Sequence, residues 1–319
     1  MIVGFVGLGN VGSKLASTLI RNKIKTFVFD TNPKALEPAV KAGGILSKEL
    51  STIAQNSNII ITCLPSPEIC ANVIEGQNGL LANARGDQIW VEMSTNNSAE
   101  VIRLANRLKD KRIMSADCPV SGGCHRADTG NISIFSGCDR AVFEKIKDLL
   151  FIMGKKVLHT GPLGTASQLK VMTNFLATTN LVACCEALVT MKATNIDLAT
   201  TYEAIKISSG NSFVHETESQ VILNGSRDIN FTLDLVLKDI SLFQELANSH
   251  NIPLNISPLL NQFFTKAIDK LGARANSPSI ISLLEESTGL RIQAPGFPAQ
   301  IKDTEPETPG YEIISKISN

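Results

Sequence analysis

The first 160 residues alternate short apolar runs with amphipathic segments. The apolar runs predict β-strands over 2–7, 25–30, 58–65, 88–94 and 112–120. The segments between them, such as 13–22 and 98–110, repeat apolar residues at helical spacing and predict α-helices. This alternation favours a parallel, doubly wound α/β sheet, which two later apolar runs, 131–137 and 155–161, would extend.

The pattern changes after Gly161. Residues 164–195 form one long helical pattern, and further helical segments follow at 198–207, 234–249 and 256–271. The last residues combine four prolines with four acidic side chains, which is typical of an extended arm. We therefore predict a doubly wound sheet domain (1–162), an all-helical domain joined to it by the long helix (163–286), and a Pro-rich arm (287–319).

Charge and cysteine usage exclude several classes of function. Thirty basic and thirty acidic residues cancel, so we expect no nucleic-acid or membrane partner. The seven cysteines are scattered without a CxxC pair, which favours a reducing cytoplasm. We recognise no signal peptide and no apolar run approaching the roughly 18 residues of a membrane span. The histidines show no metal-ligand spacing, so we predict no metal site.

A glycine-rich turn joins the first predicted strand to the first predicted helix. It reads Gly7-Leu8-Gly9-Asn10-Val11-Gly12, the dinucleotide-binding fingerprint of a Rossmann fold in its expected context. Asp30 ends the second predicted strand and Thr31 follows it; an acidic side chain at this place binds both ribose hydroxyls and repels a 2′-phosphate. This favours NAD over NADP. The alternative is a plain tight turn, with Asp30 as a helix cap.

Two further strands end toward the same edge of the predicted sheet. Their last residues are Leu64-Pro65 and Ser94-Thr95, which we predict to line the cofactor site. The segment Ser121-Gly122-Gly123 follows another strand, and its hydroxyl and amides would cradle a carboxylate. A simple loop start or glycine turn is the alternative at each place.

Lys170 and Asn174 lie four residues apart on one face of the long helix. Burying a lysine is costly, so a buried Lys170 calls for a use of its charge or its proton. A lysine can act as a general base when its pKa is lowered from about 10.4 by burial or by a nearby positive charge. The alternative is a lysine at the helix margin, with its head in solvent.

Taken together, these motifs resemble the β-hydroxyacid dehydrogenase family of 3-hydroxyisobutyrate dehydrogenase and tartronate semialdehyde reductase. The matching stretches are GLGNVG, DCPVSGG, GPLGTASQLKVMTN and LDLVLKDISLFQELA, over about residues 1–285. The resemblance implies that Lys170 is the catalytic acid/base and that Asn174 and Ser121–Gly123 hold the substrate. It also implies that Lys238 lies near nicotinamide and substrate, and that the substrate lies in a cleft between the domains.

We therefore expect NAD-dependent oxidation of a small anionic β-hydroxyacid, or the reverse reduction, by a homodimer or homotetramer. One alternative is an imine reductase of the same superfamily, although such relatives usually carry aspartate or tyrosine in place of Lys170. Another is a non-catalytic NAD-binding sensor or scaffold. The chain departs from the family where Cys124-His125-Arg126 follows the glycines. These side chains would either bind a second acidic group of the substrate or cap the loop.

Overall fold

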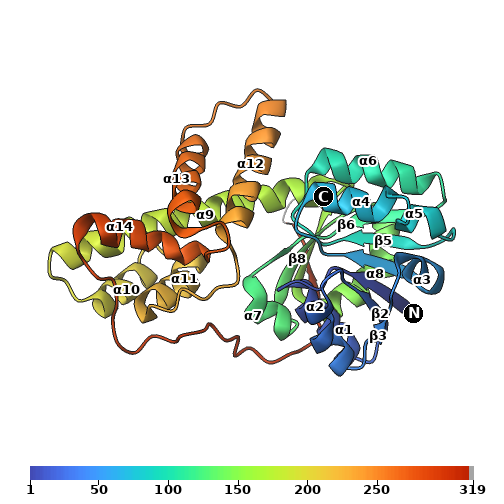
Figure 1. The fold of residues 1–319 in the computed structure, drawn as a ribbon, viewed down its shortest axis with the longest axis horizontal. Helices are drawn as coiled ribbons and strands as arrows, with labels where there is room; N and C mark the ends of the chain where they lie inside the picture. The colour runs from blue at the N-terminus through green and yellow to red at the C-terminus, as the bar shows by residue number, and fades with distance from the viewer. Residues whose placement is uncertain (316–319) are drawn as a thin grey trace. The chain divides into compact units, whose positions relative to one another are not determined.

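The computed structural model describes residues 1–315, which form two compact units (Figure 1). The sheet unit comprises residues 1–170 and 303–315, and the helical unit comprises residues 171–302. The limits predicted from the sequence follow changes in the type of element, whereas these units follow contacts. The contacts assign the last described residues to the sheet unit, together with the first residues of the long helix.

The sheet unit is built on one large β-sheet with the order β10-β9-β8-β6-β5-β4-β1-β2-β3, and β7 pairs with β8. Its strands pair in parallel, except that β8 is antiparallel to β6 and β7. The predicted α/β class is confirmed; the sequence pattern did not reveal the antiparallel pairs. The strands are β1 (Ile2–Val6), β2 (Lys25–Phe29), β3 (Ile45–Leu46), β4 (Ile59–Thr62), β5 (Ile89–Glu92), β6 (Met114–Asp117), β7 (Val120–Ser121), β8 (Ile132–Gly137), β9 (Gly154–Gly161) and β10 (Tyr311–Ile313).

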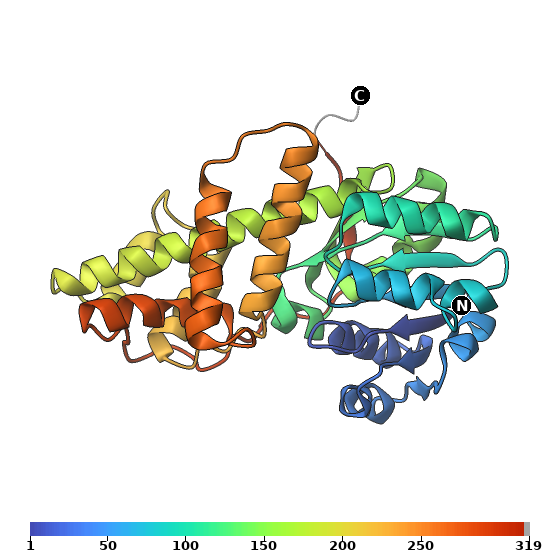
Figure 2. The ribbon, with the colours of Figure 1, turned by 45° about the horizontal axis from the view of Figure 1, so that its top comes forward.

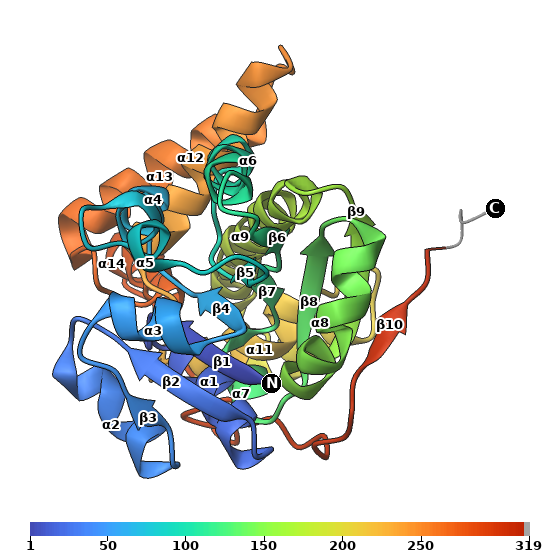
Figure 3. The same cartoon turned by 90° about the vertical axis from the view of Figure 1, so that its right-hand side faces the viewer.

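Helices cover both faces of this sheet, because successive strand side chains point to opposite faces and both sets are apolar. In β4, Ile59 and Ile61 belong to one core and Ile60 to the other. Figure 3 shows the helices on either side of the strands. The first core is closed by α1 (Gly12–Arg21), α2 (Pro33–Lys41), α7 (Gly123–Asp128) and α8 (Arg140–Met153), and the second by α3 (Leu50–Asn56), α4 (Pro67–Glu75), α5 (Leu80–Asn83) and α6 (Ser98–Lys109).

The helical unit has its own apolar core, to which Leu188, Ile240 and Phe264 contribute. The helices α12 and α13 form a hairpin, seen in orange in Figure 2. The helices are α9 (Thr165–Ala193), α10 (Leu198–Lys206), α11 (Phe213–Asn224), α12 (Leu233–Ser249), α13 (Ile256–Leu271) and α14 (Ile281–Thr288), and a 3-10 turn (Ser277–Ile280) precedes α14. The predicted helical C-terminal region is confirmed.

The long helix α9 bears on one expectation. By length and composition alone it is apolar enough to cross a membrane, and it is the one such helix in the described residues. This test uses mean hydropathy, whereas the sequence prediction concerned an unbroken apolar run, and α9 is interrupted by polar residues such as Lys170 and Asn174. The core helix of a soluble protein passes the same test, and Leu181, Cys185 and Leu188 of α9 do lie in the core of the helical unit.

Candidate active site

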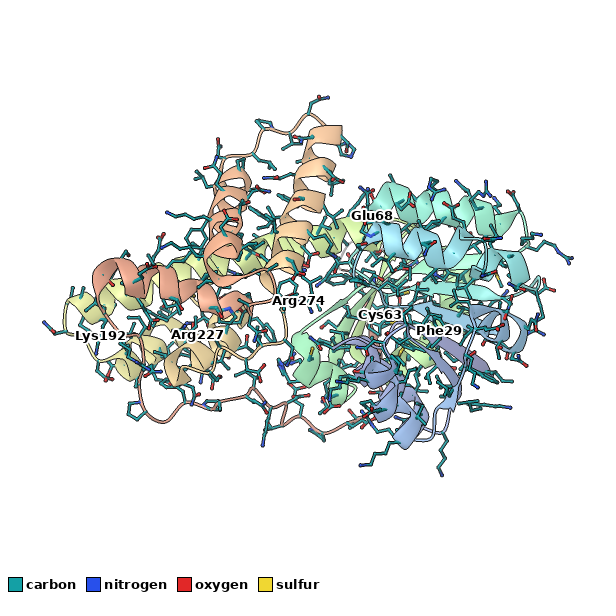
Figure 4. The ribbon with its side chains drawn as sticks, in the orientation of Figure 1. Phe29, Cys63, Glu68, Lys192, Arg227 and Arg274 are labelled. Atoms are coloured by element: carbon teal, nitrogen blue, oxygen red, sulfur yellow. The ribbon has the colours of Figure 1, made fainter. Side chains whose placement is uncertain are left out.

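The glycine turn lies between β1 and α1, and its close contacts leave no room for a side chain at Gly7 or Gly12. The Gly7 N–H donates to the Phe29 carbonyl at 3.0 Å, and a Cβ on Gly7 would stand 2.3 Å from the Cys63 carbonyl oxygen. Figure 4 labels Phe29 and Cys63. A Cβ on Gly12 would lie 2.1 Å from the Gly7 carbonyl oxygen. A Cβ on Gly9, in contrast, would meet nothing within 4 Å. The space above Gly9 is therefore open to a ligand.

Asp30 lies directly against this turn. Its carboxylate accepts hydrogen bonds from the Leu8 N–H and the Asn32 N–H, both at 2.7 Å. This hydrogen bond from Leu8 joins the end of β1 to the end of β2. The structure thus brings together the glycine turn and the acidic residue that the sequence singled out. Thr31 follows as an exposed residue. The turn and Asp30 fit the pyrophosphate and the adenosine ribose of a dinucleotide.

Gly9 and Gly12 provide a matched pair of variants that test this site. Gly9→Ala is expected to leave the melting temperature within about a degree, because its methyl group enters open space, while lowering NADH affinity about tenfold or more by blocking the approach of the pyrophosphate. Gly12→Ala is expected to lower the melting temperature by several degrees, because its methyl group overlaps the Gly7 carbonyl. Thermal melts without cofactor and NADH fluorescence titrations measure both effects. Unchanged NADH affinity in Gly9→Ala would remove the turn from the cofactor site.

The next two strand ends are joined by a buried network around Glu92. Its carboxylate accepts from the Ser94 N–H at 2.8 Å, the Cys70 thiol at 2.9 Å and the Thr62 hydroxyl at 2.5 Å. Burial raises the pKa of Glu92, against the opposing effect of these hydrogen bonds. The Leu64 N–H donates to the Ser94 hydroxyl at 2.7 Å, so Leu64 and Ser94, with Pro65 and Thr95 next to them, are held side by side.

Asp117, the last residue of β6, connects the predicted substrate loop to the helix of Lys170. Its carboxylate accepts from the Gly164 N–H at 3.1 Å and the Ser167 N–H at 2.7 Å, which caps the start of α9. Asp117 lies four residues before Ser121, and Ser167 lies three residues before Lys170. Burial raises the pKa of Asp117 to about 6, although the two backbone hydrogen bonds act in the opposite direction.

This carboxyl group makes a prediction about stability. Because the pKa of Asp117 in the folded protein, about 6, exceeds its unfolded value of about 3.9, the wild type loses stability as the pH rises between these values. The amide side chain of an Asp117→Asn variant does not titrate. The free energy of unfolding of this variant relative to wild type is therefore expected to rise by about 2 kcal/mol between pH 4.5 and pH 7.5. Denaturant unfolding at several pH values measures the difference. Parallel curves for the two proteins would contradict the raised pKa.

The side chains of His125 and Arg126 lie close to the loop Ser121–Gly123. Gly122 has φ of 126°, a conformation that favours glycine, and a Cβ there would lie 3.3 Å from Cδ of Arg126. A Cβ on Gly123 would lie 2.9 Å from the ring of His125. Burial and the neighbouring Arg126 lower the pKa of His125. His125 and Arg126, two of the three residues that depart from the family pattern, therefore lie close to the predicted carboxylate loop.

Lys170 lies near the start of α9 and is only 7% exposed. A lysine at the helix margin with its head in solvent would be far more exposed. Asn174 follows one helical turn later, and its side-chain amide donates to the carboxylate of Asp239. The Lys238 ammonium group lies 3.0 Å from the other oxygen of that carboxylate. The structure thus joins two predicted residues, Asn174 and Lys238, through Asp239, which is 2% exposed.

Three acidic residues of these networks were not predicted as site residues. Glu92 and Asp117 close buried strands, and Asp239 follows Lys238 in α12. Glu92 and Asp117 could have been recognised from the sequence, because each is an acidic residue near the end of a predicted strand. Within residues 1–315, no group of three or more His, Cys, Asp or Glu side chains is arranged to hold a metal ion.

Comparisons with known proteins identify the family of this chain. Residues 2–161 match the family model for the NAD binding domain of 6-phosphogluconate dehydrogenase, and residues 164–284 match the model for NAD-binding of NADP-dependent 3-hydroxyisobutyrate dehydrogenase. The 2-(hydroxymethyl)glutarate dehydrogenase of Eubacterium barkeri is 30% identical over 291 residues, covering 91% of this chain and 97% of that protein. The mitochondrial 3-hydroxyisobutyrate dehydrogenase of Mus musculus is 26% identical, covering 89% and 87%.

The fold is shared as well. A crystal structure of 3-hydroxyisobutyrate dehydrogenase from Salmonella typhimurium has a TM-score of 0.81 to this chain at 23% identity, covering 89% of this chain and 99% of that one. The two family models together include the glycine turn, the Ser121–Gly123 loop and the helix of Lys170. The chain belongs to the β-hydroxyacid dehydrogenase family, and it is an oxidoreductase that binds NAD(P).

Proposed function

We propose that this protein interconverts a small β-hydroxyacid and its semialdehyde or keto acid with NAD, and that Lys170 transfers the proton. The observation that carries the proposal is the bridge made by Asp117. Its carboxylate bonds to the start of α9, so the predicted carboxylate loop and the predicted proton-transfer residue extend from one buried point. Holding both segments at one buried carboxylate supports the proposal that they act on the same substrate.

The residues divide the chemistry between them. The bound dinucleotide supplies a nicotinamide ring that accepts or returns a hydride. Ser121, Gly122 and Gly123 hold the carboxylate of the substrate, and Asn174 orients the substrate near its hydroxyl group. Lys170 takes the hydroxyl proton during oxidation and returns it during reduction. Lys238 and Asp239 fix the amide of Asn174 through the contacts described above.

NAD rather than NADP is the proposed cofactor. The support is Asp30, whose carboxylate is held in place by the Leu8 and Asn32 N–H groups at the end of β2. A fixed negative charge there accepts hydrogen bonds from the ribose hydroxyls and repels a 2′-phosphate. The nearest following cation in the sequence is Lys34. Its backbone N–H bonds to the Asn32 side chain at 3.1 Å.

The proposed substrate class follows from a chemical feature shared by the substrates for which two relatives are named. The hydroxyacids in 2-(hydroxymethyl)glutarate dehydrogenase and 3-hydroxyisobutyrate dehydrogenase both carry a hydroxymethyl group on the carbon that bears a carboxylate. We propose the same arrangement for the substrate of this protein. Of the two compounds, only 2-(hydroxymethyl)glutarate carries a second carboxylate. Arg126 and His125 lie next to the proposed carboxylate loop, where they would bind such a second acidic group.

A panel assay tests the proposal. NADH formation is followed at 340 nm with about twenty short hydroxyacids, including dicarboxylic, sulfonated and phosphorylated compounds, with NADP in parallel. Turnover of a hydroxymethyl acid with NAD supports the class and names the substrate. A parallel assay follows NADH oxidation with semialdehydes and cyclic imines, and activity confined to the imines would replace the proposal with imine reduction. NADH binding without turnover in either direction would favour a non-catalytic NAD-binding protein.

We also propose that the protein is a homodimer or homotetramer of the cytoplasm. The support is that the helical unit exposes the large apolar side chains Leu176 at 50%, Ile207 at 86% and Leu259 at 65%, which a subunit interface would bury. All seven cysteines are free of disulfides, and five of them are buried, which fits a reducing compartment. Light scattering behind a sizing column measures the mass, and a monomer would refute the assembly.

A further inference from the structure

The C-terminal arm lies outside both family models, the second of which ends at residue 284, and its residues 303–315 belong to the sheet unit. Each of its four acidic side chains has a partner there. Asp303 accepts from Thr129 and Asn131, Glu305 pairs with Arg126, Glu307 pairs with Arg21, and Glu312 pairs with Arg140. At its end, β10 pairs in parallel with β9, seen at the edge of the sheet in Figure 3.

Within the arm, residues 303–305 hold the segment that follows the carboxylate loop. The side chain of Asn131 is 3% exposed and donates to the Asp303 carboxylate at 2.7 Å and to the Glu305 carbonyl at 2.9 Å. The Thr129 hydroxyl donates to the same Asp303 oxygen. Hydrogen bonds from Thr129 and Asn131 lower the pKa of Asp303 despite its partial burial, so its charge is retained at neutral pH.

These contacts continue without a gap to the loop itself. The Asn131 N–H donates to the Arg126 carbonyl at 2.8 Å, and the Arg126 guanidinium lies 3.4 Å from the Glu305 carboxylate. The stem of Arg126 in turn lies beside Gly122, where an added Cβ would stand 3.3 Å from its Cδ. Because α7 is a single short helix of six residues, holding its C-terminal end and Arg126 restrains Gly122 and Gly123 at its other end.

Two departures from the family pattern therefore meet in space. One is Cys124-His125-Arg126 after the glycines, and the other is the added arm. An isolated surface ion pair such as Arg126–Glu305 contributes little to global stability. The ion pair lies between the arm and Gly122, so it can instead hold the loop in place. We propose that the arm is a built-in clamp in which Asp303 and Glu305 position the carboxylate loop Ser121–Gly123 for substrate. This assignment rests on the proposed function for the substrate's contact with the loop.

The test uses point variants of the full chain. Asp303→Ala and Glu305→Gln remove the two grips, and Glu312→Gln is the matched control, because it removes an arm carboxylate that pairs with Arg140 on α8 instead. Hydrogen exchange of amides 122–131 is measured by mass spectrometry without any ligand. With the substrate found by the panel, KM and kcat are measured as well, along with NADH affinity and melting temperature.

In Asp303→Ala we expect loop exchange to accelerate at least about tenfold and KM to rise about tenfold, with kcat and NADH affinity within twofold of wild type. Glu305→Gln should also accelerate loop exchange and raise KM, but by less. Glu312→Gln should change neither loop exchange nor KM. Unchanged loop exchange in Asp303→Ala overturns the clamp. Faster exchange with an unchanged KM overturns the positioning role. If the wild type turns over no hydroxyacid, the proposed function fails while the exchange result still decides the clamp.

Discussion

Replacing Lys170 with alanine is expected to lower kcat roughly a thousandfold while leaving NADH affinity within about twofold of wild type. The reason is that oxidation of an alcohol requires a base for the hydroxyl proton, and the proposed site offers this amine for that purpose. Lys170 is 7% exposed and stands three residues after Ser167, whose N–H is capped by Asp117. Stopped-flow turnover and fluorescence titration of NADH separate the chemical step from cofactor binding.

The same helix supplies the control. Lys192 lies near the other end of α9, labelled in Figure 4, and Lys192→Ala is expected to change neither kcat nor affinity by more than twofold. Lys170→Arg adds a second comparison, because arginine keeps the positive charge but does not release a proton near neutral pH. It should be as inactive as the alanine variant. Activity of Lys170→Ala within a few-fold of wild type would show that another group moves the proton.

Replacing Asp30 should reverse the cofactor preference. In Asp30→Ala the ribose loses a charged acceptor, and a 2′-phosphate loses a repulsive neighbour, so the ratio of kcat/KM for NAD to that for NADP is expected to fall about a hundredfold. Asp30→Arg should lower it further, because the guanidinium group also attracts the 2′-phosphate. Steady-state kinetics with both cofactors give the ratio directly.

Asp30 also accepts the Leu8 N–H at 2.7 Å, so its loss loosens the glycine turn for either cofactor. Asp30→Asn separates the two effects. Its side-chain oxygen still accepts from Leu8, while its charge is gone, so NADP should gain more than in the alanine variant. If the NAD to NADP ratio stays within threefold of wild type in all three variants, Asp30 does not contact the ribose.

Local patterns in the sequence were enough to predict the elements that carry the site. The apolar runs at 2–7, 58–65 and 88–94 contain β1, β4 and β5, and the pattern at 164–195 contains α9 with Lys170 inside it. The glycine turn and Asp30 were also found together, because a strand end, a turn and a helix start each leave a mark within a few residues. The contact from Leu8 to Asp30 confirms that the two predicted features meet.

What the sequence did not reveal depends on contacts between distant segments. β10 is three residues long and pairs with β9 about 150 positions earlier, which no local period encodes. The carboxylate of Asp117 is set apart from other acidic residues only by its approach to Gly164 and Ser167. The grip of Asp303 on Asn131 is likewise set by the path of the returning chain. The roles of Lys170, Asn174, Lys238 and Ser121–Gly123 in catalysis stay predictions until the variants are measured.

Because residues 303–315 belong to the sheet unit, that unit cannot be completed until the end of translation. During synthesis, residues 1–170 emerge well before 303–315, so the outer edge of β9 is unpaired while the helical unit is translated. An open strand edge is a template for pairing with other chains. Nascent chains stalled before residue 303 should therefore aggregate more readily than released ones, and a bulky fusion after the arm would delay closure of that edge.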